Sequence, residues 1–133
     1  MKKRILVVDD EVSFRYFLLN ALELAGYSVT AVASGEEALL RARCYDFDAI
    51  ITDMVMPNMQ GSELITRLRS SGFQTPIIAI TGLPEGEACL ADAESFHVDC
   101  VLHKPFSLSD ICSVVERLIG SVRAPSHTRN PAL

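Results

Sequence analysis

The amino-acid sequence predicts an α/β fold in which helices cover both faces of a five-stranded parallel sheet. Two observations predict it. Short runs of branched apolar residues alternate along the chain with longer segments whose apolar residues recur at helical spacing. The short runs are apolar at successive positions, as expected for strands that are buried on both faces. Five such strand–helix units in succession predict a doubly wound sheet with right-handed crossovers.

The first half of the chain contains three of the predicted strands and two of the helices. The strands are expected at residues 4–8, 27–32 and 47–52. The first helix is predicted over 12–25, where the apolar residues with helical spacing are Phe14, Phe17, Leu18, Ala21, Leu22 and Ala25. Gly26 is expected to end this helix in a left-handed conformation. Ser34 and Glu37 have capping-box spacing and open a second helix that should end near Arg43.

The second half begins with a loop that contains Pro57, Asn58 and Gly61. A helix is predicted over 62–69, with Leu64, Ile65 and Leu68 facing the core. Strands are expected at 77–80 and 98–102. A helix over 85–95 would bury little apolar area and should be weakly anchored. Ser107 is expected to cap the last helix, whose residues at core spacing are Leu108, Ile111, Val115 and Leu118.

The length of 133 residues suits one domain with a core of its own. We expect that domain over residues 1–121. Residues 122–133 contain two prolines and no apolar period, so a flexible tail is expected there. The longest apolar runs fall far short of the ~20 residues that cross a bilayer, and the start does not resemble a signal peptide, so a cytoplasmic location is expected.

Charge and cysteine content narrow the function classes. The formal net charge is −5, and an acidic surface repels phosphate backbones, so direct nucleic-acid binding is not expected. The cysteines are Cys44, Cys89, Cys100 and Cys112. Their spacing fits neither a metal site nor a redox pair, and we expect them to be buried small hydrophobic residues.

Polar residues follow four of the predicted strands. Asp9 and Asp10 follow the first, Asp53 the third, Thr81 the fourth and Lys104 the fifth. The carboxyl ends of parallel strands meet at one edge of the sheet, where open α/β sheets bind their ligands. Taken singly, Asp10 could cap the helix from Val12, Thr81 could be an ordinary strand residue and Lys104 a surface lysine. Their joint placement favours a site.

The chemistry of this set indicates phosphoryl transfer. Three crowded carboxylates repel one another, and a hard divalent cation such as Mg²⁺ relieves that repulsion. An aspartate can act as a nucleophile that takes a phosphoryl group as an acyl phosphate. Mg²⁺ and Lys104 would neutralise the transferred group, and the Thr81 hydroxyl can donate a hydrogen bond to it.

At this point four motifs together resemble a known family. They are Val7-Val8-Asp9-Asp10-Glu11, Asp53-Met54-Val55-Met56-Pro57, Thr81-Gly82 and Lys104-Pro105-Phe106. In this order and spacing they resemble the CheY-like receiver domain of two-component response regulators, over about residues 3–120. The resemblance implies a flavodoxin-like fold with strand order 2-1-3-4-5. It also implies a cis peptide bond between Lys104 and Pro105.

The resemblance further implies a role for each site residue. Asp53 would be the phosphoacceptor. Asp10 would ligate Mg²⁺ most directly, with Asp9 acting through water, and the Asp53 carboxylate and the Val55 backbone carbonyl would complete the protein ligands. Thr81 would move towards the phosphoryl group. Lys104 would pair with the Asp53 carboxylate or phosphate.

The resemblance also implies partners. A sensor histidine kinase or a histidine phosphotransfer domain would donate the phosphoryl group, and charge at Asp53 would switch binding to a downstream protein or an output domain. Catalysis would be limited to self-catalysed phosphoryl transfer and autodephosphorylation. Apolar Val55 and Leu83 beside the pocket predict slow autodephosphorylation.

Two departures from the family pattern keep other readings open, and one of them is that His97 and Val98 replace the small pair usually found before Asp99. Receivers commonly carry Tyr or Phe where this chain has Val101, and valine cannot make the inward swing of that aromatic. An interaction module that is never phosphorylated therefore remains an alternative, although the intact acidic set argues against it. An aspartate-based phosphatase is a third reading. It usually needs an acid two residues after the nucleophile, where this chain has Val55.

Overall fold

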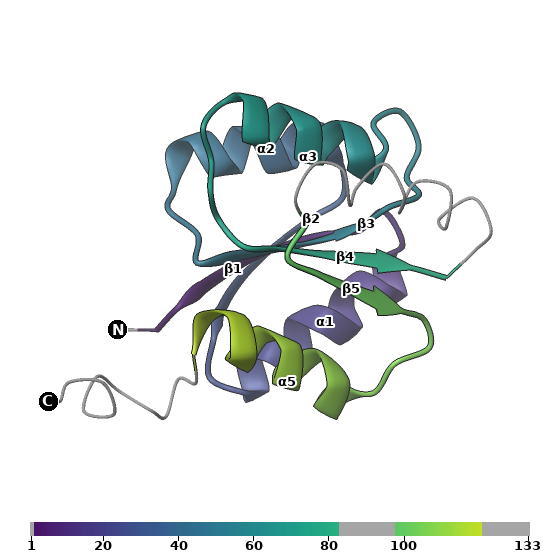
Figure 1. Ribbon diagram of the computed structural model, residues 1–133. Helices are drawn as coiled ribbons and strands as arrows, with labels where there is room; N and C mark the ends of the chain where they lie inside the picture. The colour runs from purple at the N-terminus through teal and green to yellow at the C-terminus, as the bar shows by residue number, and fades with distance from the viewer. Residues whose placement is uncertain (1, 83–97, 121–133) are drawn as a thin grey trace, which may run out of the picture.

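The computed structural model of the protein describes residues 2–82 and 98–120 and contains a five-stranded parallel sheet (Figure 1). The strands are β1 (Arg4–Val8), β2 (Ser28–Val32), β3 (Ala49–Asp53), β4 (Ile77–Thr81) and β5 (Cys100–His103). The helices are α1 (Val12–Leu24), α2 (Gly35–Cys44), α3 (Gly61–Ser70) and α5 (Leu108–Ile119). The sheet order is β2-β1-β3-β4-β5, which confirms the predicted doubly wound fold.

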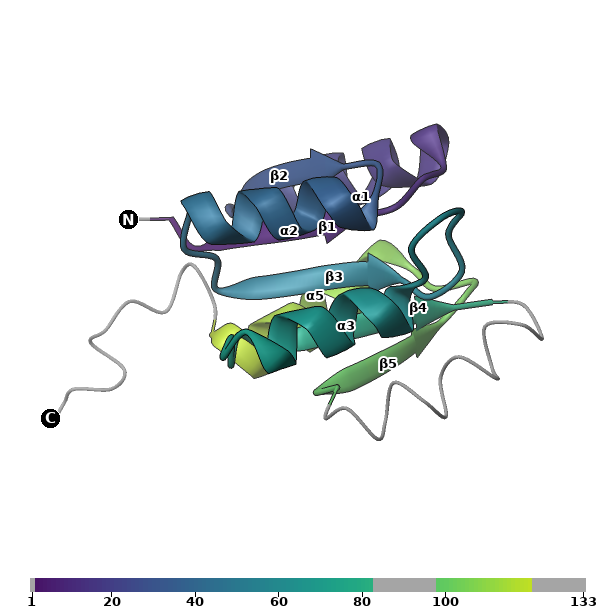
Figure 2. The ribbon, with the colours of Figure 1, turned by 90° about the horizontal axis from the view of Figure 1, so that it is seen from above.

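Helices α2 and α3 cover one face of the sheet, and α1 and α5 cover the other (Figures 1 and 2). Alternate strand residues therefore enter different cores. In β1, Leu6 and Val8 belong to the apolar cluster that includes α2 and α3 residues, whereas Ile5 and Val7 belong to the cluster with α1 and α5 residues. Every residue of β3 and β4 is buried, as expected for central parallel strands.

Local signals in the sequence end and begin the helices. Gly26 has a φ of 103°, and the amides of Gly26 and Tyr27 donate to the carbonyls of Glu23 and Leu22, the pattern of a Schellman cap. Ser107 and Asp110 form a complete capping box at the start of α5. At α2, the Ser34 hydroxyl accepts from the Glu37 amide as predicted, but the Glu37 carboxylate accepts from the Ala33 amide, so the predicted box is only half formed.

Several expectations need correction. Leu108 is 44% exposed, because as the first residue of α5 it precedes the turn whose Ile111, Val114 and Val115 face the core. Gly61 begins α3 and does not lie in the preceding loop. The prediction of buried cysteines is wrong for Cys44, which is exposed, and Cys100 and Cys112 are only half-buried. Cys44 is the last residue of α2, so its place at the helix end, and not the hydrophobicity of the thiol, decides its exposure.

Some predictions lie outside the described residues. They are the helix over 85–95, the tail over 122–133, and the positions of Leu83 and Cys89. Within the described part of the chain, no helix is long and apolar enough to span a membrane.

Candidate functional site

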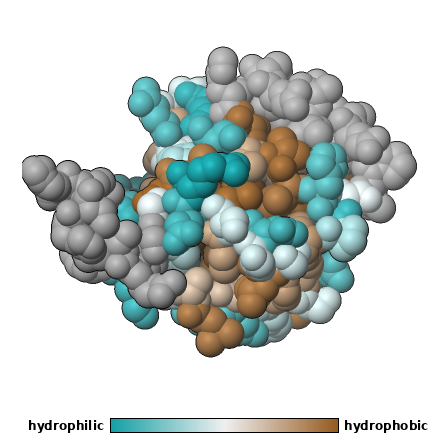
Figure 3. Space-filling view, turned by 60° about the horizontal axis from the view of Figure 1, so that its bottom comes forward, coloured by the Kyte–Doolittle hydropathy of each residue, from teal (hydrophilic) through white to brown (hydrophobic). Residues whose placement is uncertain are grey.

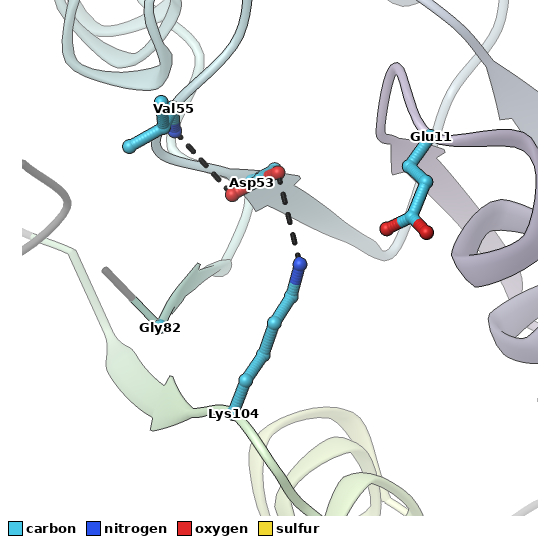
Figure 4. Close-up of a pocket in the computed structure, with 5 residues that line it drawn as sticks. All are labelled: Glu11, Asp53, Val55, Gly82 and Lys104. Atoms are coloured by element: carbon cyan, nitrogen blue, oxygen red, sulfur yellow. Dashed lines mark hydrogen bonds and ion pairs between the residues drawn. The ribbon is translucent and has the colours of Figure 1, made fainter.

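The carboxyl ends of the strands converge on an open pocket, as the sequence predicts (Figure 4). Its volume is about 290 Å³, and it is lined by Glu11, Asp53, Val55, Gly82 and Lys104. Parallel ladder hydrogen bonds continue one residue past the strand ends and hold the site residues in place. The Asp9 amide donates to the Val32 carbonyl at 3.1 Å, and the Lys104 amide donates to the Thr81 carbonyl at 2.8 Å.

The acidic residues form a cluster that could hold a cation. One carboxylate oxygen from each of Asp9, Asp10 and Asp53 lies within 4.8 Å of the others. Asp9 is fully buried and Asp10 is exposed, so the cluster extends from the interior to the surface. The Oδ1 atom of Asp9 accepts from the Glu11 amide at 2.9 Å. Its Oδ2 atom is buried and has no hydrogen-bond partner among the described residues.

Burial raises the pKa of two of these carboxyl groups. The pKa of Asp9 rises from 3.8 to about 6, first because burial penalises its charged form and further because Asp53 and Asp10 repel it. Burial also raises the pKa of Asp53, opposed by the Lys104 cation and the Val55 amide. A carboxylate oxygen that is buried without a partner beside two like charges is suited to a hard divalent cation. The donor set therefore fits Mg²⁺.

Asp53 lies between a cation and a backbone donor. The Nζ atom of Lys104 is 3.9 Å from Asp53 Oδ2, and the Val55 amide donates to Asp53 Oδ1 at 3.3 Å (Figure 4). The Asp53 side chain is 12% exposed, so an incoming group can reach it from the pocket.

Thr81 lies at the end of β4, one residue beyond Ile80, which pairs with Asp53 in the sheet. The residue is fully buried, and its Oγ1 atom makes no hydrogen bond within the described ranges. A buried hydroxyl without a partner costs free energy unless a ligand or a movement satisfies it. The hydroxyl is thus available to a new acceptor.

The structure brings every predicted site residue to this edge of the sheet. It also removes the alternative for Asp10, because the N-cap of α1 is Glu11 and no side-chain hydrogen bond caps that helix. The Lys104–Pro105 peptide is cis, as the resemblance implied.

Two neighbours of the site had no predicted role. Glu11 lines the pocket, and the Phe14 ring centroid lies 4.2 Å from the Lys104 Nζ atom. Glu11 directly follows Asp9 and Asp10 in the sequence, and this position could have indicated that it lines the same pocket. Helical spacing placed Phe14 in the core but carries no information about Lys104, which lies on a distant segment.

Comparisons with known proteins agree with this geometry. The family model of the response regulator receiver domain matches residues 5–116. The response regulator receiver protein CpdR of Brucella abortus is 38% identical, over 88% of this chain and 97% of CpdR. The alkaline phosphatase synthesis transcriptional regulatory protein PhoP of Bacillus subtilis is 34% identical. This match covers 95% of this chain but only 53% of PhoP. The chain thus spans about half the length of PhoP.

Solved structures show the same similarity. The chemotaxis response regulator CheY4 of Vibrio cholerae superposes with a TM-score of 0.80 at 32% identity, covering 89% of this chain and 99% of CheY4. The receiver domain of the sensor histidine kinase PA1611 from Pseudomonas aeruginosa superposes with a TM-score of 0.81 at 28% identity, covering 91% of this chain and all of that domain. Its structure has a magnesium ion coordinated in the active-site cleft.

Proposed function

We propose, from the premise that the chain belongs to the response regulator receiver domain family, that Asp53 is its phosphoacceptor. Receiver domains act in two-component signalling and are in general not enzymes. The observation that supports the proposal most is the placement of Asp53: its carboxylate lies 3.9 Å from the Lys104 ammonium and belongs to one cluster with Asp9 and Asp10, at the end of a buried strand.

In the proposed reaction, an Asp53 carboxylate oxygen attacks the phosphorus atom of a phosphohistidine. The P–N bond to the donor imidazole breaks, an acyl phosphate forms, and the imidazole nitrogen takes up the leaving electron pair and a proton. Lys104, whose ammonium already lies 3.9 Å from Asp53, balances the charge on the phosphoryl oxygens. The unpartnered Thr81 hydroxyl donates a hydrogen bond to one of them.

We assign the cation site to Asp9, Asp10 and Asp53, with the Val55 backbone carbonyl as a further ligand. The unpartnered Asp9 Oδ2 supports this assignment, since it is the buried acceptor most in need of a positive charge. A bound Mg²⁺ would neutralise the carboxylates and the phosphoryl oxygens.

The partners follow from the proposed role. A sensor histidine kinase or a histidine phosphotransfer protein donates the phosphoryl group, and a downstream protein or an output domain reads the phosphorylated state. We expect a cytoplasmic location, a receiver domain over residues 1–121 followed by a flexible tail, and no direct nucleic-acid binding. The domain's own catalysis is limited to accepting and slowly hydrolysing the phosphoryl group.

The test is the intact mass of the protein after incubation with acetyl phosphate, with and without Mg²⁺. We expect one phosphoryl adduct that requires Mg²⁺ and is absent in Asp53→Asn. The matched control is Asp46→Asn, which removes an exposed aspartate outside the site and should keep the adduct. A folded wild type that forms no adduct would contradict the proposal and favour the unphosphorylated interaction module.

A further inference from the structure

The side chain of Lys104 is held at its base and along its stem. The Lys104 amide donates to the Thr81 carbonyl at 2.8 Å, which fixes the backbone. A Cβ atom added to Gly82 would lie 2.9 Å from Lys104 Cβ and 3.2 Å from Lys104 Cδ. The lysine stem therefore occupies space that Gly82 leaves free by having no side chain.

The ion pair alone gives weak control over the ammonium. The Lys104 Nζ and Asp53 Oδ2 atoms are 3.9 Å apart, well beyond the distance of a charge-assisted hydrogen bond, and the lysine side chain is 29% exposed. Lysine carries its charge on a flexible four-carbon stem with many rotamers. A second attractive contact at the tip is needed to keep the ammonium at the pocket.

The ring of Phe14 supplies that contact. Its centroid lies 4.2 Å from Lys104 Nζ, within the range in which the negative face of an aromatic ring attracts a cation. The ring has a defined position of its own, because it packs edge-to-face against Phe106 with centroids 5.6 Å apart and an interplanar angle of 79°. Phe106 follows Lys104 by two residues, so one short segment fixes both the lysine and the ring that it meets.

We propose that Phe14 is a positioning residue for phosphoryl transfer, which holds the Lys104 ammonium at the mouth of the pocket through its ring. The proposal rests on the proposed role of Asp53. A cation that is already in place stabilises the charge of the transferred group without reorganisation during the reaction. Loss of the ring would leave Lys104 present but distributed over more rotamers.

The kinetic test compares Phe14→Leu with Phe14→Tyr and Tyr16→Leu. Tyr16 is the matched control: it is an aromatic residue of the same helix, it is 57% exposed, and its ring meets neither Phe14, Phe106 nor Lys104 within the described chain. The face formed by α1 and α5 carries exposed apolar patches (Figure 3). At saturating Mg²⁺, we expect adduct formation from acetyl phosphate to be about two- to fivefold slower in Phe14→Leu. Phe14→Tyr, which keeps the ring, should restore the wild-type rate, and Tyr16→Leu should not change it.

The spectroscopic test observes the contact without any phosphorylation. A ring this close shifts the ε-methylene proton resonances of Lys104 by its ring current. The shift should be present in wild type, Phe14→Tyr and Tyr16→Leu, and lost in Phe14→Leu.

The two tests separate the possible failures. An absent shift in wild type would overturn the proposal, as would an unchanged rate in Phe14→Leu once the shift is lost. A Phe14→Tyr variant that keeps the shift but stays slow would overturn it as well. A wild type that shows the shift but forms no adduct would instead overturn the role of Asp53, and with it the catalytic part of this proposal.

Discussion

Replacing Asp9 with asparagine should stabilise the protein when Mg²⁺ is absent. The Asp9 side chain is fully buried, and one of its oxygens has no hydrogen-bond partner within the described residues. Asparagine has the same shape, keeps an oxygen for the Glu11 amide and carries no charge. At the position of the unpartnered oxygen, asparagine places a neutral amide nitrogen with two N–H donors, one more than a protonated carboxyl group has, so the variant removes the cost of the charge and adds at most the cost of one further unpaired donor.

The magnitude follows from the pKa of Asp9, which burial raises from 3.8 to about 6. Because the folded state holds this proton more tightly than the unfolded state, the wild type loses stability as pH rises through the interval between those two values. Above it, the penalty is roughly 3 kcal/mol, from a shift of about two pKa units. The advantage of Asp9→Asn should therefore be largest above about pH 7 and shrink towards about pH 4.

Urea unfolding in the presence of a chelator measures this difference. With a slope of about 2 kcal/mol per M, the midpoint of Asp9→Asn should lie roughly 1–2 M above that of the wild type at about pH 7.5. Asp10→Asn is the matched control, because it removes an exposed charge from the same cluster and should change the free energy of unfolding by at most about 0.5 kcal/mol.

Added Mg²⁺ should reverse the order. The wild type gains stability by binding the cation, whereas Asp9→Asn lacks one of the ligands. An Asp9→Asn variant that is no more stable than the wild type at about pH 7.5 without metal would refute the reasoning, because the buried carboxylate would then cost nothing.

Three further changes test other parts of the structure. Gly61→Ala should lower the free energy of unfolding by roughly 1–3 kcal/mol in a urea titration. The added Cβ would lie 2.5 Å from the Asp53 carbonyl oxygen, a backbone atom that cannot turn away. An unchanged urea midpoint would contradict this close approach. Ser107→Ala should lower the free energy of unfolding by about 1 kcal/mol in the same assay, because the Asp110 amide loses its acceptor at the start of α5. Equal stability of the two proteins would show that the cap contributes nothing. Val55→Asn should shorten the lifetime of the phosphorylated protein, which intact mass measurements over time can follow. The apolar Val55 side chain beside Asp53 hinders the hydrolytic water in the wild type. An unchanged lifetime would count against that role.

The fold could be predicted because its determinants are local. Branched apolar runs located the five strands, and Gly26 and Ser107 marked a helix end and a helix start. The site could be predicted because all its residues lie at the carboxyl ends of strands or just after them, and parallel strands place these ends together. That argument needs only the order of the strands along the chain and no knowledge of side-chain packing.

The remaining details depend on contacts between distant segments or on the exact phase of a helix. Leu108 has core spacing, yet it stands before the first inward turn and is exposed. Cys44 is apolar enough for a core, but it ends α2 at the surface. Lys104 and Phe106, which meet the Phe14 ring, come from the segment after β5, and no spacing within α1 could reveal them.

The buried carboxylates of the acidic site lower the stability of the folded protein. Asp9 and Asp53 sit at the ends of β1 and β3, whose apolar residues are buried on both faces, and burial raises the pKa of both carboxyl groups. Apolar residues at these positions would avoid that cost but could hold neither a cation nor a phosphoryl group. Because the cost is relieved only when positive charge enters the pocket, the same burial that destabilises the empty site increases its preference for a cation. A cation or a phosphoryl group that enters the pocket therefore meets carboxylates whose charged forms burial has already destabilised.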